Sequence, residues 1–136
     1  MSEIQLHEWS PMSKFNRLEE IQVWQKARAL TYQINILSFS IETRIDYDLQ
    51  RQVRRSATSI AANIAEGYGR KSKKEFAHFL DIAYGSAVET KSHLYIAHDL
   101  GFIEKAEFDP LLELCDEISR MLFVLARKVR ESVTKQ

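Results

Sequence analysis

The stretch PLLELCDEISRMLFVLARKV, residues 110–129, decides the fold of this 136-residue chain. Its apolar residues alternate at spacings of four and three, the pattern of the seam in a helical bundle or coiled coil. The seam consists of Leu111, Cys115, Ile118, Leu122, Leu125 and Val129. Asp109 and Pro110 precede it and are typical of an N-cap and a first helical residue. A helix with such a seam buries it against other helices, so the sequence predicts a bundle.

Three further segments repeat apolar residues at helical spacing, and they predict helices over about 18–39, 48–66 and 72–100. The chain has only four Gly and two Pro, too few to supply the turns of an all-β domain. Because the connections are short, including a predicted loop over 40–48, we expect an all-α, antiparallel up-down-up-down four-helix bundle. The predicted bundle domain covers residues 17–131, between a flexible leader (1–16) and a frayed tail (132–136).

Capping residues mark the predicted helix ends. Gly67 and Gly101 follow apolar stripes at the places where left-handed C-terminal caps are expected. Ser72 and Glu75 have the spacing of a capping box, in which each side chain bonds the other residue's amide.

Asn63 and Glu66 lie near the end of the second predicted helix, close in sequence to Tyr68 and Arg70. They could form a hydrogen-bonded functional network at the end of the bundle. Capping and pairing between helices is the reading we favour, because short polar side chains often serve helix ends.

Composition narrows the class of protein. The 19 basic and 19 acidic residues give a net charge of zero, so bulk charge does not point to nucleic acid. A single cysteine excludes an internal disulfide and suits a reducing compartment. The N-terminus has no signal-peptide pattern, and no apolar run approaches the roughly 20 residues of a membrane span. We therefore expect a cytoplasmic protein without a membrane partner.

Charge is unevenly distributed along the chain. Between residues 99 and 117 there are seven acids and only one base, Lys105. Between residues 49 and 74 the single acid, Glu66, is outnumbered by seven bases: Arg51, Arg54, Arg55, Arg70, Lys71, Lys73 and Lys74. These bases are candidates for binding the phosphates of nucleic acid at a corner between the second and third helices. A solvated face with salt bridges to acids of neighbouring subunits, such as Glu113 or Glu117, is the reading we favour for these residues taken alone, because helix surfaces are commonly charged.

The third predicted helix has a second line of side chains off its core face, formed by Tyr84, Val88, Lys91 and Tyr95. Such a line could stack on the bases of single-stranded nucleic acid. It is more typical of an oligomer interface, which is the reading we favour.

No catalytic or metal site is predicted, and no cofactor. His78, His93 and His98 are not spaced as paired ligands, and His7 lies in the leader. Cys115 lies in the core seam, where a thiol is expected to be inert. The glycines near residue 67 lack the pattern of a phosphate-binding loop. We therefore expect a protein that is not an enzyme.

Three stretches resemble a known family: VWQKA (23–27), RRSATSIAANIAEG (54–67, followed by Gly69 and Arg70) and FLDIAYGS (79–86, followed by Glu89). They are similar to the four-helix-bundle proteins encoded within intervening sequences of bacterial 23S rRNA genes. That family looks related to accessory proteins of diversity-generating retroelements, which form pentameric rings and bind nucleic acid and a reverse transcriptase. The resemblance implies a homopentamer, with RNA or DNA and a nucleic-acid enzyme as partners. Most members have no established biochemical role, and a protein-interaction scaffold without nucleic acid is the alternative.

Overall fold

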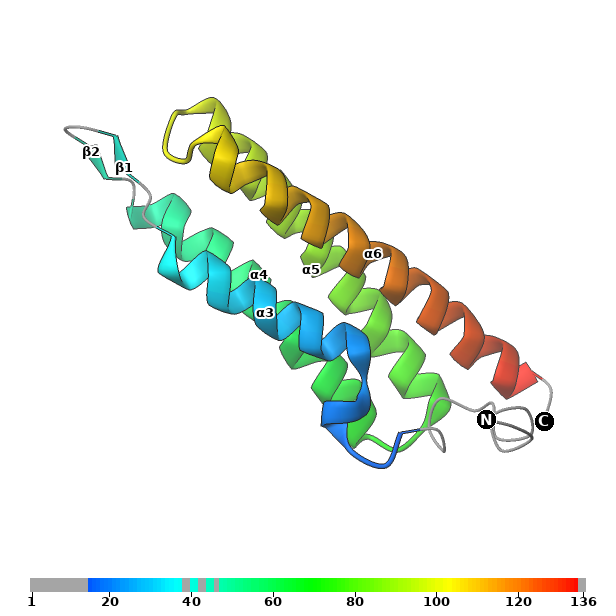
Figure 1. Ribbon diagram of the computed structural model, residues 1–136. Helices are drawn as coiled ribbons and strands as arrows, with labels where there is room; N and C mark the ends of the chain where they lie inside the picture. The colour runs from blue at the N-terminus through cyan, green and yellow to red at the C-terminus, as the bar shows by residue number, and fades with distance from the viewer. Residues whose placement is uncertain (1–14, 38–39, 42–43, 46, 135–136) are drawn as a thin grey trace.

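The computed structural model describes residues 15–37, 40–41, 44–45 and 47–134, and four helices form its bundle. They are α3 (Gln22–Ile36), α4 (Tyr47–Gly69), α5 (Lys73–Asp99) and α6 (Lys105–Thr134), and a 3₁₀ turn, η1 (Leu18–Glu20), precedes α3. Each helix runs antiparallel to the one before it (Figure 1). The predicted all-α bundle is confirmed. None of the described helices is both long enough and apolar enough to cross a membrane.

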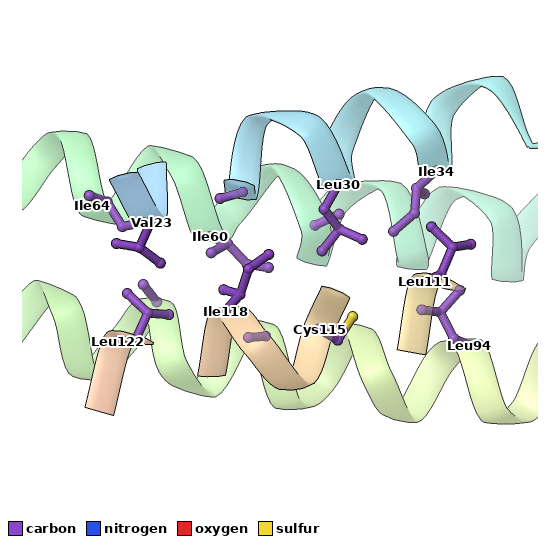
Figure 2. Close-up of a cluster of buried hydrophobic side chains, with 14 of the residues drawn as sticks. Val23, Leu30, Ile34, Ile60, Ile64, Leu94, Leu111, Cys115, Ile118 and Leu122 are labelled. Carbon is purple, nitrogen blue, oxygen red and sulfur yellow. The ribbon is translucent and has the colours of Figure 1, made fainter. Parts of the chain in front are cut away.

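All four helices contribute to one hydrophobic core. Figure 2 shows Leu30 and Ile34 of α3 above Cys115 and Leu111 of α6, with Leu94 of α5 beside Leu111. Five of the six predicted seam residues of α6 are buried, and the sixth, Leu125, is packed against the core at its edge. The alternation of four and three therefore identified the buried face of α6 correctly.

The end of α4 differs from the prediction. Gly67 is not a left-handed cap: it lies inside α4 and is buried, and the helix continues to Gly69. A Cβ atom at Gly67 would lie 2.7 Å from the Cβ atom of Phe79, so the missing side chain lets α5 approach closely. The left-handed residue is Lys71, with φ of 59°.

The caps of α5 agree with its predicted ends more closely. Ser72 Oγ accepts a hydrogen bond from the Glu75 amide at 3.3 Å. Among the described residues, the Glu75 carboxylate does not accept a hydrogen bond from the Ser72 amide in return. It accepts one from Arg70 instead. Gly101 has φ of 80°, and the amide of Phe102 donates to the carbonyl of Ala97, which is the bond of a Schellman motif.

The start of α6 also corrects the prediction. Asp109 and Pro110 lie inside the helix, which begins at Lys105. The amide of Glu104 donates to the Glu107 carboxylate, and the Glu104 carbonyl accepts from Phe108, so these bonds form the first turn. Pro110 is the sixth helical residue and has no amide hydrogen, so the backbone bond to the Ala106 carbonyl is missing near the start of α6.

The connection between α3 and α4 is not the plain loop we predicted. Two short strands, β1 (Ser40–Ile41) and β2 (Arg44–Ile45), pair antiparallel with Ser40 opposite Ile45. The first helix ends at Ile36, before the predicted residue 39, which lies outside the described residues, as does most of the predicted leader. At the other end, α6 continues to Thr134, past the predicted boundary at residue 131.

Candidate nucleic-acid and assembly surfaces

The seven candidate basic residues form two groups instead of one corner. Arg51, Arg54 and Arg55 lie near the start of α4. The other four lie in the turn to α5 (Arg70, Lys71) or in the first turn of α5 (Lys73, Lys74). The 18 helical steps from Arg51 to Gly69 rise about 27 Å along the helix. The structure therefore does not bring the two groups together (Figure 1).

Arg54 has a structural role that its neighbours lack. Its Nη2 donates to the carbonyl oxygen of Asn35 at 3.1 Å, in the last turn of α3, where helix carbonyls lack partners within the helix. Its Nε is buried without an acceptor among the described residues. Arg54 thus holds the end of α3 against α4 and is poorly placed to bind a phosphate.

Arg51 and Arg55 are exposed on the outer side of α4, one turn apart. Arg51 Nη2 lies 3.3 Å from Asp48 Oδ1, in an exposed pair of the kind that contributes little to stability. Arg55 has no acidic partner in the described part of the chain. Both guanidinium groups are therefore accessible to a ligand.

The α4–α5 turn, taken here together with the first turn of α5, holds four cations, and Arg70 is the one that pairs with acidic side chains. Arg70 lies between Glu66 at 2.9 Å and Glu75 at 3.1 Å, and its guanidinium covers the ring of Phe79. The hydrogen bond that Arg70 donates to Glu66 raises the pKa of Arg70. Glu66 and Glu75 thus neutralise Arg70.

Lys71, Lys73 and Lys74 have no acidic partner within the described residues. Lys71 and Lys74 are exposed, and Lys73 is half-buried at the first position of α5. Three cations at a helix N-terminus repel one another and the helix dipole. A bound anion would relieve that repulsion.

A line of hydroxyl groups joins α4 to α5, and sequence reasoning did not single it out. Thr90 Oγ1 lies 2.9 Å from Ser56 Oγ, and Ser59 Oγ lies 2.9 Å from Ser86 Oγ. Asn63 continues this line, because its Nδ2 donates to Ser59. Asn63 therefore does not join Glu66 in a network at the end of the bundle. The sequence did contain a sign of this contact, since hydroxyl residues occur on the core-facing side of both helices.

The outer side of α5 and α6 exposes large apolar side chains, and we call it the α5–α6 face. The predicted residues Tyr84, Val88 and Tyr95 are exposed on it, and so is Phe123 of α6, which sequence reasoning missed. The rings of Tyr84 and Phe123 lie 6.5 Å apart beside a shallow groove of about 510 Å³. Lys91 Nζ pairs with Asp116 at 2.8 Å, and that hydrogen bond raises the pKa of Lys91. An apolar surface of this kind is typical of an interface with another protein.

The histidines do not converge on one site. His93 contacts Glu89 at 3.3 Å, His98 stacks on Phe108, and His78 meets the ring of Phe79. No group of three metal-binding side chains occurs in the described ranges. Burial raises the pKa of Cys115 to about 12, which keeps its thiol protonated and unreactive at neutral pH.

Comparison with known proteins gives a consistent family. No curated protein matches the chain. Among solved structures, a protein of unknown function from the S23 ribosomal protein family of Bacteroides thetaiotaomicron is 26% identical, with a TM-score of 0.71. The match covers 77% of this chain and 95% of that one. The family model described as 23S rRNA-intervening sequence protein matches residues 19–124. Since this match spans most of the chain and includes most of the bundle, the chain belongs to the 23S rRNA-intervening sequence protein family.

Proposed function

We propose that this protein is a non-enzymatic homo-oligomer that binds RNA phosphates through exposed cations of α4 and the α4–α5 turn. The observation that carries the proposal is the group Lys71, Lys73 and Lys74, three adjacent cations without acidic partners in the described structure. Arg51 and Arg55 would add contacts farther along α4, whereas Arg54 and Arg70 are engaged within the chain. We take RNA as the nucleic acid to be tested first, because the family's description associates it with 23S rRNA intervening sequences.

Binding of this kind is electrostatic and largely independent of sequence. Each lysine that neutralises a phosphate releases counterions, so affinity falls as salt rises. The neutral net charge of the chain does not oppose this, because the acids of residues 99–117 lie around the other end of α5. Charged groups farther away than the Debye length of about 10 Å are largely screened at 0.1 M salt.

Self-association would use the α5–α6 face. Tyr84, Val88, Tyr95 and Phe123 present apolar area that a single chain leaves in water. A closed ring is the arrangement we favour, with five subunits by the likeness to retroelement accessory proteins. A reverse transcriptase or similar nucleic-acid enzyme would be a further partner on the same grounds.

The test is RNA binding by fluorescence anisotropy over a range of salt concentrations. We expect the triple variant Lys71→Gln, Lys73→Gln, Lys74→Gln to weaken binding and to reduce the slope of log affinity against log salt by about 2, for three lost contacts. The matched control removes three exposed cations of α6 (Lys105→Gln, Arg120→Gln, Arg127→Gln) and has the same net charge. If both triple variants behave alike, only overall charge matters and the assignment to the turn is wrong.

A protein-interaction scaffold is the second candidate. The apolar α5–α6 face and the acidic segment 99–117 favour it, since neither needs nucleic acid. Light scattering at low and high salt, with and without RNA, separates the two. An oligomer whose mass is indifferent to RNA at low salt would support the scaffold and contradict RNA binding.

A further inference from the structure

The outer side of α3 and α4 is almost free of acidic residues. Helix α3 contains no Asp or Glu, and α4 contains none between Asp48 and Glu66. Three arginines stand on this side with their side chains exposed: Arg28, Arg51 and Arg55. A positively charged strip therefore extends over two helices, and it is separate from the lysines of the α4–α5 turn.

Two tyrosines stand on the same side and are unusually exposed. Tyr32 has 67% of its surface exposed and Tyr47 62%, more than any other aromatic residue in the described part of the chain. Neither ring packs on another ring or makes a hydrogen bond within the described residues. A solitary exposed aromatic residue needs no explanation. Two on a basic surface whose one nearby acid, Asp48, is paired with Arg51 resemble the stacking platforms that proteins offer to unpaired bases.

Contacts between the helices fix the relative positions of these groups. Thr31 Oγ1 lies 3.2 Å from the carbonyl of Ala57, and Arg54 reaches the carbonyl of Asn35. Tyr32, next to Thr31, is therefore nearly level with Arg55. Arg28 precedes Tyr32 by one turn of α3, and Tyr47, Arg51 and Arg55 follow one another at single turns of α4, about 5.4 Å each. Each ring thus has an arginine about one helical turn away along the same helix.

Arg28 keeps its charge free for a ligand. Its guanidinium lies 5.7 Å from the centre of the Trp24 ring, and its Nη1 donates to the neutral amide of Gln25. These contacts orient the side chain without neutralising it. The positive charge and the flat geometry both suit a phosphate.

We propose that the α3–α4 face, defined by Arg28, Tyr32, Tyr47, Arg51 and Arg55, binds single-stranded RNA. Unpaired bases stack on the two tyrosine rings, and the arginines bind the phosphates between them. This inference rests on the proposed RNA-binding function and specifies the form of RNA that is bound. The α3–α4 face remains open in an oligomer built through the α5–α6 face, because the two pairs of helices form different sides of the bundle (Figure 1).

The experiment compares a labelled single-stranded RNA of about 12 nucleotides, within the usual range of such sites, with a duplex of the same length. The variant Tyr32→Ala, Tyr47→Ala removes both rings, and Tyr32→Phe, Tyr47→Phe retains them as the matched control. We expect the alanine variant to lose at least about fivefold in single-strand affinity per ring and to bind the duplex as wild type does. The phenylalanine variant should bind both RNAs as wild type does.

Each contrary result has a distinct meaning. If the alanine variant binds the single strand as tightly as wild type, the stacking proposal is overturned, while a continued effect of the Lys71, Lys73 and Lys74 substitutions would leave the proposed function intact. If wild-type protein binds neither RNA at low salt, both proposals fail. If the alanine variant changes the mass of the protein in solution, another protein chain covers this face and the RNA assignment is overturned.

Discussion

Replacing Gly67 by Ala tests the close approach of α4 and α5. The new Cβ atom would lie 2.7 Å from Phe79 Cβ, 3.2 Å from Phe76 Cδ1 and 3.3 Å from Phe76 Cα. The Phe79 Cβ and Phe76 Cα atoms belong to or adjoin the backbone of α5, so rotating a side chain cannot relieve the overlap. The helices must move apart along their best-packed contact.

Two effects oppose each other in this variant. Alanine favours an interior helix position by about 1 kcal/mol over glycine. Overpacking in a rigid core costs about 1 to 3 kcal/mol, and contact with backbone puts this site near the upper limit. We therefore expect the free energy of unfolding to fall by about 2 kcal/mol.

Urea unfolding followed by far-UV circular dichroism measures this change. Gly69→Ala is the matched control, because it makes the same substitution in the same helix with no atom within 4 Å of the new Cβ. It should be neutral or slightly stabilising. Gly67→Ala at or above wild-type stability would refute the packing argument.

Three further predictions concern other positions. Lys71→Gly should stabilise the fold by about 1 kcal/mol, since φ of 59° is unfavourable for lysine. An unchanged free energy of unfolding in urea would contradict the left-handed conformation of Lys71. Thr90→Val should cost about 1 kcal/mol by removing the buried hydroxyl that meets Ser56, and the same urea titration would contradict this if Val were neutral. Burial raises the pKa of the Cys115 thiol in the folded state to about 12, from 9.0 in the unfolded chain, so its contribution to stability is full below pH 9 and is lost as pH rises toward 12. At pH 10.5 wild type should have lost about 2 kcal/mol more than Cys115→Ala, and equal losses in the two proteins would show that the thiol is not buried.

Helical periodicity was sufficient to predict the fold, because an apolar seam such as that of α6 is buried by packing against the apolar faces of other helices. Local signals at helix ends were less reliable. Gly67 has the sequence context of a cap, yet its lack of a side chain serves packing against Phe79. Asp109 and Pro110 look like a helix start, but the bonds of Glu104 and Glu107 begin α6 one turn earlier.

The candidate site was predicted less completely for physical reasons. Proximity in sequence made Arg51 and Lys71 look like one cluster, although the rise of a helix separates them. Arg54 could not be distinguished from Arg55, because the difference arises from the end of another helix at Asn35. Phe123 was overlooked, because an apolar residue beside a heptad seam gives no sign of whether a neighbouring helix covers it.

The short α3 is the element least firmly tied into the bundle. It has 15 residues, whereas α4, α5 and α6 have 23, 27 and 30. Short segments with fewer buried contacts open by local unfolding more readily than the rest of a domain. The amide protons of α3 should therefore exchange with solvent faster than those at the centres of α5 and α6. Since α3 carries Arg28 and Tyr32, a ligand on the α3–α4 face would slow that exchange. Binding at this face would then also control how often local unfolding of α3 exposes the core to water.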